Sequence, residues 1–291
     1  MDTSRLLDTL DAEGRSLATA ARQAGTDATV PTCPEWRIAD LLRHTGAVHR
    51  WAAGFVAEGL KRPRPLDAPP EVDGAELVDW YQDSHRTLVE TLRTAAPDID
   101  CWTFLPAPSP LAFWARRQAH ETTVHRFDAE SALSGPQVPQ VPQIPQVPQI
   151  PQATHIPSAG PAVPAPSPVA PGFAVDGIDE LLRGFHARSR SRVRTDEPRV
   201  LRVRATNTRL HTRADADAEP DPDTDTGADA VWTVRLSQEP PVTTRGADGP
   251  AECELAGPAD QLYLALWNRV PIPQVSGDPA LAALWRELSG I

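Results

Sequence analysis

The chain has 291 residues, enough for one large domain or two modest ones, and we expect two. Hydrophobic residues make up 40% of the chain and eight residues are tryptophan, which excludes a wholly disordered protein despite the 32 prolines. The net charge of −11 argues against nucleic acid as a partner.

Cysteine usage and hydropathy bear on the compartment. The chain has three cysteines, Cys33, Cys101 and Cys253, and no two of them are close in the sequence. Neither a disulfide framework nor a cysteine-rich zinc site is therefore indicated. No apolar run reaches 18 residues. We therefore expect no membrane segment and a location in the reducing cytoplasm.

Four helices are predicted in the first 134 residues, over residues 4–23, 35–59, 75–96 and 111–133. In the second, apolar residues from Ile38 to Phe55 recur at spacings of three and four, the period of a helix with one buried face. Thr32 and Glu35 have the spacing of a capping box ahead of it. Residues 1–134 are thus predicted to form an antiparallel four-helix bundle.

Residues 135–172 have the composition of a linker. Twelve of these 38 residues are proline, and a three-residue VPQ-type unit repeats in the first half. Proline at every third position favours an extended polyproline II helix. We interpret the segment as a stiff spacer or loop, with a docking ligand for a partner domain as the alternative.

Residues 173–291 are predicted to form a helix and a smaller α+β domain. Helical patterns cover residues 176–192, 260–269 and 279–288, and alternating strand patterns cover 200–205 and 231–236, with 251–255 as a further candidate strand. The acidic run 214–230 lacks the glycine and glutamate positions of a calcium-binding loop, so we interpret it as a solvated loop. The predicted fold class is α+β.

The residues that indicate chemistry lie on the fourth helix. His120 and His125 are five residues apart, about 140° around a helix, and cannot converge on one ion, whereas Glu121 and His125 can. Gln118, Glu121, His125 and Asp128 follow one face, and burying such groups is costly unless something neutralises them. A metal ion does so efficiently, and polar faces in helical bundles often mark metal sites.

Periodicity leaves alternatives open. The fourth helix could instead bury Phe113, His120, Val124 and Phe127, leaving Glu121 and His125 as a surface pair. A third ligand could come from His44 or His49 of the second helix, which flank its apolar stripe on opposite sides. Asp128 could orient a ligand or pair with Arg117 or Arg126. For Cys33, a structural role is favoured over a catalytic one.

Four strings carry a resemblance to a known family. They are CPEWRIADLLRHTGAVHRWA, WARRQAHETTVHRFDAE, DGIDELL and GPADQLYLALWNR. Together they resemble the mycothiol-dependent maleylpyruvate isomerase family, one of the DinB-like metal-binding bundles. The resemblance covers nearly the whole chain outside the linker and the acidic run.

The resemblance implies a divalent metal, usually zinc, bound by His44, Glu121 and His125. It chooses His44 over His49, although Arg43-His44-Thr45 departs mildly from the family pattern. It also implies that Arg269 reaches the active site, with Asn268 where glycine is common. We expect Arg269 to bind the substrate anion rather than to contribute to folding.

The implied function is that of a metal-dependent enzyme that uses mycothiol as a thiol cosubstrate. It would transfer the thiol to a small unsaturated acid such as maleylpyruvate, or isomerise that acid from cis to trans. Three protein ligands leave a position open for the thiolate, as in catalytic zinc sites. The alternative is a non-catalytic metal or thiol sensor.

Overall fold

The computed structural model describes residues 1–134, 165–206 and 229–290. The VPQ repeat and most of the acidic run, predicted as spacer and solvated loop, lie outside the described residues. Within the described part, no helix is long and apolar enough to span a membrane.

Four long helices form the N-terminal domain, namely α1 (Thr3–Ala24), α2 (Ile38–Glu58), α3 (Gly74–Thr94) and α4 (Pro110–Ser131). Local signals fix several of their ends. The side chain of Asp2 accepts the backbone N–H of Arg5 at the start of α1, and Ser109 caps α4 ahead of Pro110. A short 3₁₀ turn, Ala132–Ser134, follows α4.

The start of α2 differs from the expected capping box. The helix begins at Ile38, and Asp40 accepts the backbone N–H of Arg37 at 2.9 Å. Residues 28–37 form turns instead, closed by a bridge between Thr29 and Arg37. Thr32 therefore does not cap α2, and its hydroxyl donates to Asp128 of α4 at 2.6 Å.

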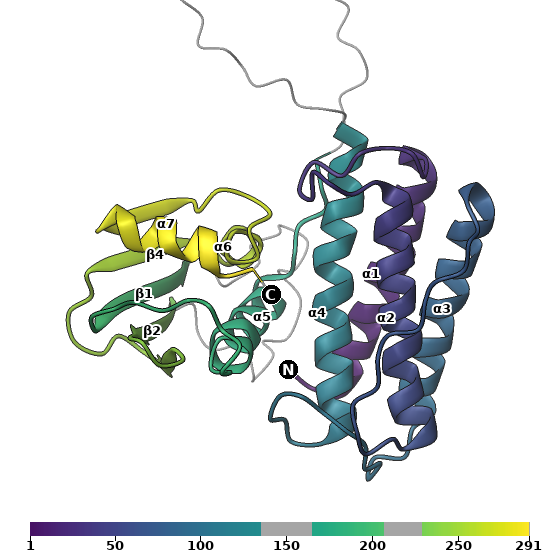
Figure 1. Cartoon of the computed structure of the whole chain (residues 1–291), viewed down its shortest axis with the longest axis horizontal. Coiled ribbons are helices and arrows are strands. Elements are labelled where there is room, and N and C mark those ends of the chain that lie inside the picture. The colour runs from purple at the N-terminus through teal and green to yellow at the C-terminus, as the bar shows by residue number, and fades with distance from the viewer. Residues whose placement is uncertain (135–164, 207–228, 291) are drawn as a thin grey trace, which may run out of the picture.

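The helix directions follow from the pairs between helices. Arg43 and Arg50 of α2 contact Asp73 and Asp83 in the same order along the chain, so α3 runs parallel to α2. Arg22 and Arg93, in contrast, link α1 and α3 in antiparallel order. The connection 59–73 thus returns along the bundle before α3 begins. α2 and α4 are antiparallel, because His44 lies beside His125 and Phe55, further along α2, lies beside Trp114 (Figure 1).

The C-terminal domain begins at α5 (Pro171–Asp179), which continues as the π-helix η2 (Glu180–Phe185). This helix starts five residues before the predicted 176–192 and ends seven residues earlier. Residues 165–170, assigned to the linker, lie on α4, where Ser167 donates its backbone N–H to Glu130 at 2.7 Å.

A mixed five-stranded sheet completes the domain, in the order β3-β2-β1-β4-β5. Its strands are β1 (Arg199–Thr206), β2 (Ala230–Leu236), β3 (Val242–Arg245), β4 (Cys253–Pro258) and β5 (Gln274–Gly277). β1 is antiparallel to β2 and parallel to β4. The sequence indicated β1, β2 and part of β4; β3 and β5 are short edge strands with mostly exposed residues, which give little periodic signal.

Two further helices, α6 (Ala259–Leu266) and α7 (Pro279–Leu288), pack with the sheet. α5 and α6 lie between the sheet and α4 (Figure 1). A Cβ on Gly177 would come within 2.3 Å of Tyr263 and 2.7 Å of His120, so this contact between α5, α6 and α4 requires glycine. One apolar core runs from the bundle into the sheet. The α+β fold with an N-terminal four-helix bundle is confirmed. The prediction that the bundle is antiparallel is wrong for α2 and α3, which run parallel because the connection 59–73 is long enough to return along the bundle.

Candidate metal centre

The C-terminal domain changes the environment of α4. The helix is buried on nearly all sides, with Gln118, His125 and Asp128 as well as Phe113, His120 and Val124 out of solvent. The alternative in which Glu121 and His125 form a surface pair on an exposed helix is therefore wrong. Polar residues of α4 face both the rest of the bundle and the C-terminal domain. Periodicity alone therefore could not choose between the two faces of the helix.

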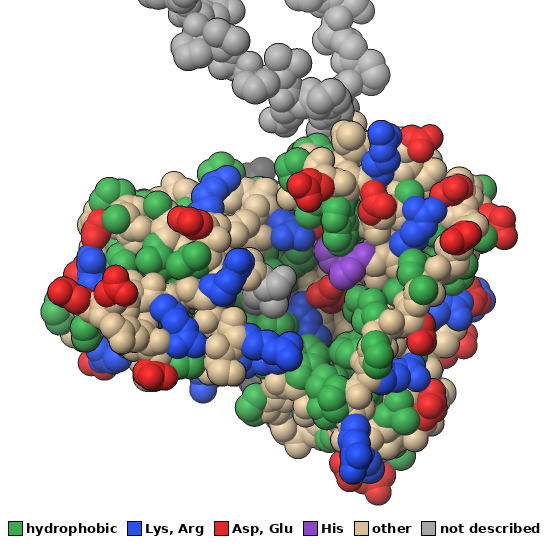
Figure 2. Space-filling view, viewed as in Figure 1, with side chains coloured by type: hydrophobic (Ala, Val, Ile, Leu, Met, Phe, Trp, Pro, Cys, Tyr) green, Lys and Arg blue, Asp and Glu red, His purple; other side chains and the backbone are tan. Residues whose placement is uncertain are grey.

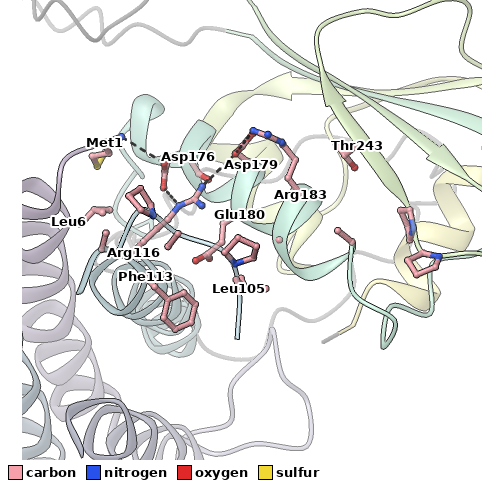
Figure 3. A pocket seen from close by; sticks show the side chains of 18 of the residues that line it. Met1, Leu6, Leu105, Phe113, Arg116, Asp176, Asp179, Glu180, Arg183 and Thr243 are labelled. Carbon is pink, nitrogen blue, oxygen red and sulfur yellow. Dashed lines mark hydrogen bonds and ion pairs between the residues drawn. The ribbon is translucent and has the colours of Figure 1, made fainter. Parts of the chain in front are cut away.

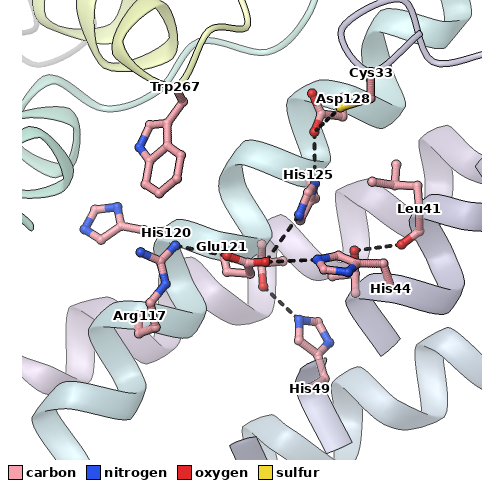
Figure 4. A network of polar contacts seen from close by, with 12 residues as sticks. Cys33, Leu41, His44, His49, Arg117, His120, Glu121, His125, Asp128 and Trp267 are labelled. Atoms are coloured by element: carbon pink, nitrogen blue, oxygen red, sulfur yellow. Dashed lines mark hydrogen bonds and ion pairs between the residues drawn. The ribbon is translucent and has the colours of Figure 1, made fainter. Parts of the chain in front are cut away.

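His44, Glu121 and His125 come together where α2 faces α4. One donor atom of each lies within 4.8 Å of the other two. Oε1 of Glu121 is 3.4 Å from Nε2 of His44 and 3.3 Å from Nε2 of His125 (Figure 4). Two imidazole nitrogens and one carboxylate oxygen thus converge from two helices.

The two separations from Oε1 of Glu121 match those between the donors of a zinc site, and the His44 and His125 donor nitrogens lie within 4.8 Å of each other. A tetrahedral ion bound at 2.0–2.1 Å has donors about 3.3–3.4 Å apart, because the edge of a tetrahedron is about 1.6 times its centre-to-corner distance. Imidazole nitrogen and carboxylate oxygen are both common zinc ligands. The three residues therefore fit a divalent metal in identity and spacing.

The other two histidines of these helices lie elsewhere. His49 is fully buried inside the bundle, where its Nε2 is 2.9 Å from Oγ1 of Thr122. His120 faces the C-terminal domain, with Nε2 2.9 Å from Asp176 and Nδ1 3.3 Å from the Tyr263 hydroxyl. Neither reaches the three converging donors.

A carboxylate supports His125 from behind. Oδ2 of Asp128 is 2.9 Å from Nδ1 of His125, so the Nε2 atom is directed toward Glu121. A carboxylate on the far nitrogen of a metal-binding histidine fixes its orientation and raises its basicity. Among the described residues, Asp128 forms no ion pair with Arg117 or Arg126, because those arginines pair with other carboxylates.

Asp128 is itself held by the C-terminal domain. Arg269 donates from Nε and Nη2 to its two oxygens, both at 2.9 Å, and from Nη1 to the carbonyl of Trp267. Among the described residues, three of the five guanidinium N–H groups are thereby used, and two remain. Arg269 is directed toward the bundle, beside the candidate metal centre.

The chain reversal after α6 explains this direction. Asn268 has φ of 62°, and the backbone N–H groups of Asn268 and Arg269 donate to Ala265 and Leu264, the two bonds of a Schellman motif. This left-handed position favours glycine, and asparagine is among the few other residues that adopt it readily. Asn268 therefore preserves the turn that brings Arg269 to Asp128.

The electrostatics follow from these pairs. Burial raises the pKa of Glu121, but hydrogen bonds to His125 and His44 outweigh it and hold that pKa well below its usual range. Burial lowers the pKa of His125, but Asp128 and Glu121 outweigh it and raise the value to about 9. Without a metal the site is therefore a carboxylate beside an imidazolium, and a cation would replace the proton on His125.

Cys33 is close to this network without being suited to nucleophilic chemistry. Its sulfur is 3.9 Å from Oδ2 of Asp128. Burial and the neighbouring Asp128 raise the pKa of Cys33 to about 11, so its thiol stays protonated at neutral pH. This agrees with the structural role favoured from the sequence.

The donors lie at the surface between the two domains. Histidine side chains appear in a hollow between the bundle and the C-terminal domain (Figure 2). The ring of Trp36 lies 5.1 Å from His44 and 6.1 Å from His125, covering one side. The His44 side chain is 36% exposed, so a small molecule can reach the donors from the hollow.

A separate groove of about 910 Å³ lies between the start of α1, the end of the 95–109 connection and α5. It is lined by Leu105, Phe113, Arg116, Asp176 and Glu180, among others, and none of the three donors lines it (Figure 3). Three of its carboxylates are already paired, Asp176 with Arg116 at 2.8 Å, Asp179 with Arg245 at 2.9 Å and Glu180 with Arg117. The groove offers no free donor set comparable to the one at His44.

Several residues of the site were not identified from the sequence. Thr32 and Trp36 lie in the loop before α2, Arg117 lies on α4, and Glu180 and Trp267 belong to the second domain. Only Arg117 gave a usable signal, because it stands four residues before Glu121 on one helix face.

Comparison with known proteins identifies both domains. Residues 7–130 match the mycothiol maleylpyruvate isomerase N-terminal domain, and residues 172–284 match the MDMPI C-terminal domain. Together the matches cover more than half of the chain. No curated protein and no solved structure matches it. With both domain types present in order, the chain belongs to the mycothiol maleylpyruvate isomerase family.

Proposed function

We propose that this protein is a metal-dependent enzyme that uses mycothiol for thiol transfer or for cis–trans isomerisation of a small unsaturated acid such as maleylpyruvate. The observation that carries the proposal is the convergence of His44, Glu121 and His125 at a partly exposed position where α2 faces α4. Both domains belong to a mycothiol-related family. Zinc is the metal that this donor set suits best.

The metal would supply a positive charge that stabilises a thiolate over a thiol. His44, Glu121 and His125 would hold it, and three protein donors leave room for a thiol sulfur. Asp128 keeps the His125 ring oriented through Nδ1. Trp36 covers the two imidazoles and shields one side of the site from water.

Arg269 is our candidate for binding the substrate carboxylate. Its two remaining N–H groups, one on each terminal nitrogen, can donate to both oxygens of a carboxylate. The pair with Asp128 holds the guanidinium in place for this contact. A substrate anchored there lies beside the three donors, because Asp128 also contacts His125.

The isomerisation needs no net change in atoms. The thiolate sulfur adds to one carbon of the cis double bond, and the bond between the two carbons becomes single and rotates. Elimination of the same thiolate then returns the trans double bond. In the transferase version, a proton is taken up at the second carbon and the thioether is released.

The proposed location is the cytoplasm. Cys33, Cys101 and Cys253 are unpaired, as in a reducing compartment. A small thiol cosubstrate also requires such a compartment to stay reduced.

Elemental analysis and a turnover assay test the proposal together. The purified protein should contain about one zinc per chain and should turn over maleylpyruvate only when mycothiol is present. His44→Ala should lose both properties, while His49→Ala, a histidine of the same helix that does not reach the donors, should keep them. Metal and mycothiol binding without turnover of any unsaturated acid would instead favour a sensor or binding module.

A further inference from the structure

Arg117 lies between two carboxylates from different domains. Its Nη2 atom donates to Oε2 of Glu121 at 3.2 Å, and its Nη1 atom donates to Glu180, the first residue of η2. The Arg117 and Glu180 side chains are 4% and 2% exposed. This ion pair is therefore almost completely withdrawn from water.

Aromatic rings enclose the same guanidinium. Its central carbon is 4.9 Å from the Phe185 ring and 5.4 Å from the Trp267 ring, both of the C-terminal domain. Rings at these distances favour a cation and restrict where it can lie. Arg117 thus has its position set by three residues of the second domain, Glu180, Phe185 and Trp267.

The two oxygens of Glu121 have separate partners. Oε1 faces Nε2 of both His44 and His125, while Oε2 is taken by Arg117 (Figure 4). Because Arg117 holds Oε2, only Oε1 of Glu121 is available to bind a cation. The number of coordination positions left on a metal for a thiol and a substrate then depends on Arg117.

Resting on the function proposed above, we propose that Arg117 and Glu180 are a positioning pair. They hold Glu121 so that it binds the metal through Oε1 alone. Because Glu180 belongs to the C-terminal domain, the pair makes metal affinity depend on the docking of that domain on α4.

Glu180 also sets the charge that Glu121 presents. Arg117 shares its positive charge between two carboxylates, so only part of the negative charge of Glu121 is neutralised. If Glu180 were uncharged, the positive charge of the buried guanidinium would neutralise Glu121 alone. That charge would also repel an incoming cation more strongly, because no second carboxylate would balance it. Both changes weaken metal binding. By reciprocity, a bound metal must strengthen the contact between the domains.

The neighbouring residue supplies a matched control. Arg116 also pairs across the interface between α4 and the C-terminal domain, with Asp176 of α5 at 2.8 Å. That pair lies in the groove of Figure 3 and contacts none of the three donors. One interdomain carboxylate is therefore removed by Asp176→Asn and another by Glu180→Gln. Of the two carboxylates, only that of Glu180 contacts the arginine that holds Glu121.

The experiment titrates full-length, metal-free protein with Zn²⁺ by calorimetry and with Co²⁺ by visible absorption. Glu180→Gln should weaken Zn²⁺ binding by about 10- to 100-fold, the range for residues that orient metal ligands, and should change the Co²⁺ spectrum, whose intensity reports coordination number. Asp176→Asn should leave both unchanged. Arg117→Lys should weaken binding as well, because one ammonium cannot replace the two terminal nitrogens that bridge Glu121 and Glu180.

The outcomes separate this inference from the proposed function. If the wild-type protein binds no metal, the proposed function is wrong. If it binds metal and Glu180→Gln or Arg117→Lys binds equally well with the same Co²⁺ spectrum, only the positioning pair is wrong. Equal weakening by Glu180→Gln and Asp176→Asn would show a general effect of the interface and would also overturn the inference. Arg117→Lys provides the test if Glu180→Gln fails to fold.

Discussion

Arg269 of the C-terminal domain donates to both carboxylate oxygens of Asp128 in α4, at 2.9 Å each. Asp128 is fully buried and contacts Nδ1 of His125 through the same carboxylate. The second domain therefore reaches the candidate metal centre through an ion pair as well as by covering it. This relationship gives Arg269 a structural role that its position at a helix end did not indicate.

We expect His125→Ala to abolish stoichiometric metal binding, because it removes one of three donors and leaves Glu121 and His44 alone. His120→Ala should retain the metal, since His120 contacts Asp176 and Tyr263 instead. Elemental analysis of the two purified variants checks this. Loss of metal from His120→Ala with retention in His125→Ala would contradict our ligand assignment.

Metal affinity should rise with pH. The pKa of His125 is about 9 without metal, so below that pH a cation must displace one proton from the imidazole. Binding of one ion with loss of one proton strengthens about tenfold per pH unit until the pH approaches that pKa. Calorimetric titrations in buffers of different ionisation enthalpy measure the proton released. An affinity independent of pH, with no proton released, would be incompatible with this prediction.

Replacing Arg269 by methionine should cost stability as well as activity. The change leaves the buried Asp128 carboxylate without its cation, and breaking such a pair costs on the order of 3 kcal/mol. The expectation from the sequence, in which Arg269 binds substrate without contributing to folding, is revised accordingly. Chemical unfolding measures the loss.

A double variant separates the two roles of Arg269. Arg269→Met with Asp128→Asn removes the unpaired buried charge, while the amide oxygen can still accept from His125. Stability should return toward that of the wild-type protein, but turnover of a carboxylate substrate should stay at least about tenfold below that of the Asp128→Asn single variant. If the double variant turns over the substrate as fast as Asp128→Asn alone, Arg269 acts only as a partner of Asp128.

The protein should lose stability below neutral pH in part through His186. Burial lowers the pKa of His186 to about 4, and its ring lies 4.8 Å from Trp285. Because the unfolded chain binds a proton near pH 6.5 and the folded chain does not, this contribution is present above that pH and is lost as the pH falls toward 4. The loss should reach about 2 kcal/mol at pH 5.

His186→Asn provides the comparison, because its amide nitrogen can replace Nδ1, which is 3.1 Å from Ser191. Unfolding free energies of both proteins at several pH values give the slopes. His49 and His85, whose pKa values burial also lowers, contribute equally to both and cancel. Parallel slopes for the two proteins would show that His186 does not titrate on unfolding.

The sequence by itself determined the elements with a strong local signal. The long helices α1 to α3 carry a 3.6-residue apolar period, α4 begins at Pro110 after a serine cap, and α7 begins at Pro279 after an aspartate cap. Their bounds were therefore predicted within a few residues. β1 and β2 alternate and were predicted on the same grounds. Spacing on α4 also showed that Glu121 and His125 share a face and that His120 does not.

Only the tertiary structure decided which groups from distant segments meet. His44 and His49 flank the same stripe of α2, and the way α2 packs on α4 brings one to Glu121 and the other to Thr122. Asp128, with three arginines to choose from, pairs with the one 141 residues away. Helical periodicity describes one helix at a time, whereas these pairs depend on the packing of separate elements, which buries charges and leaves each a single partner within reach.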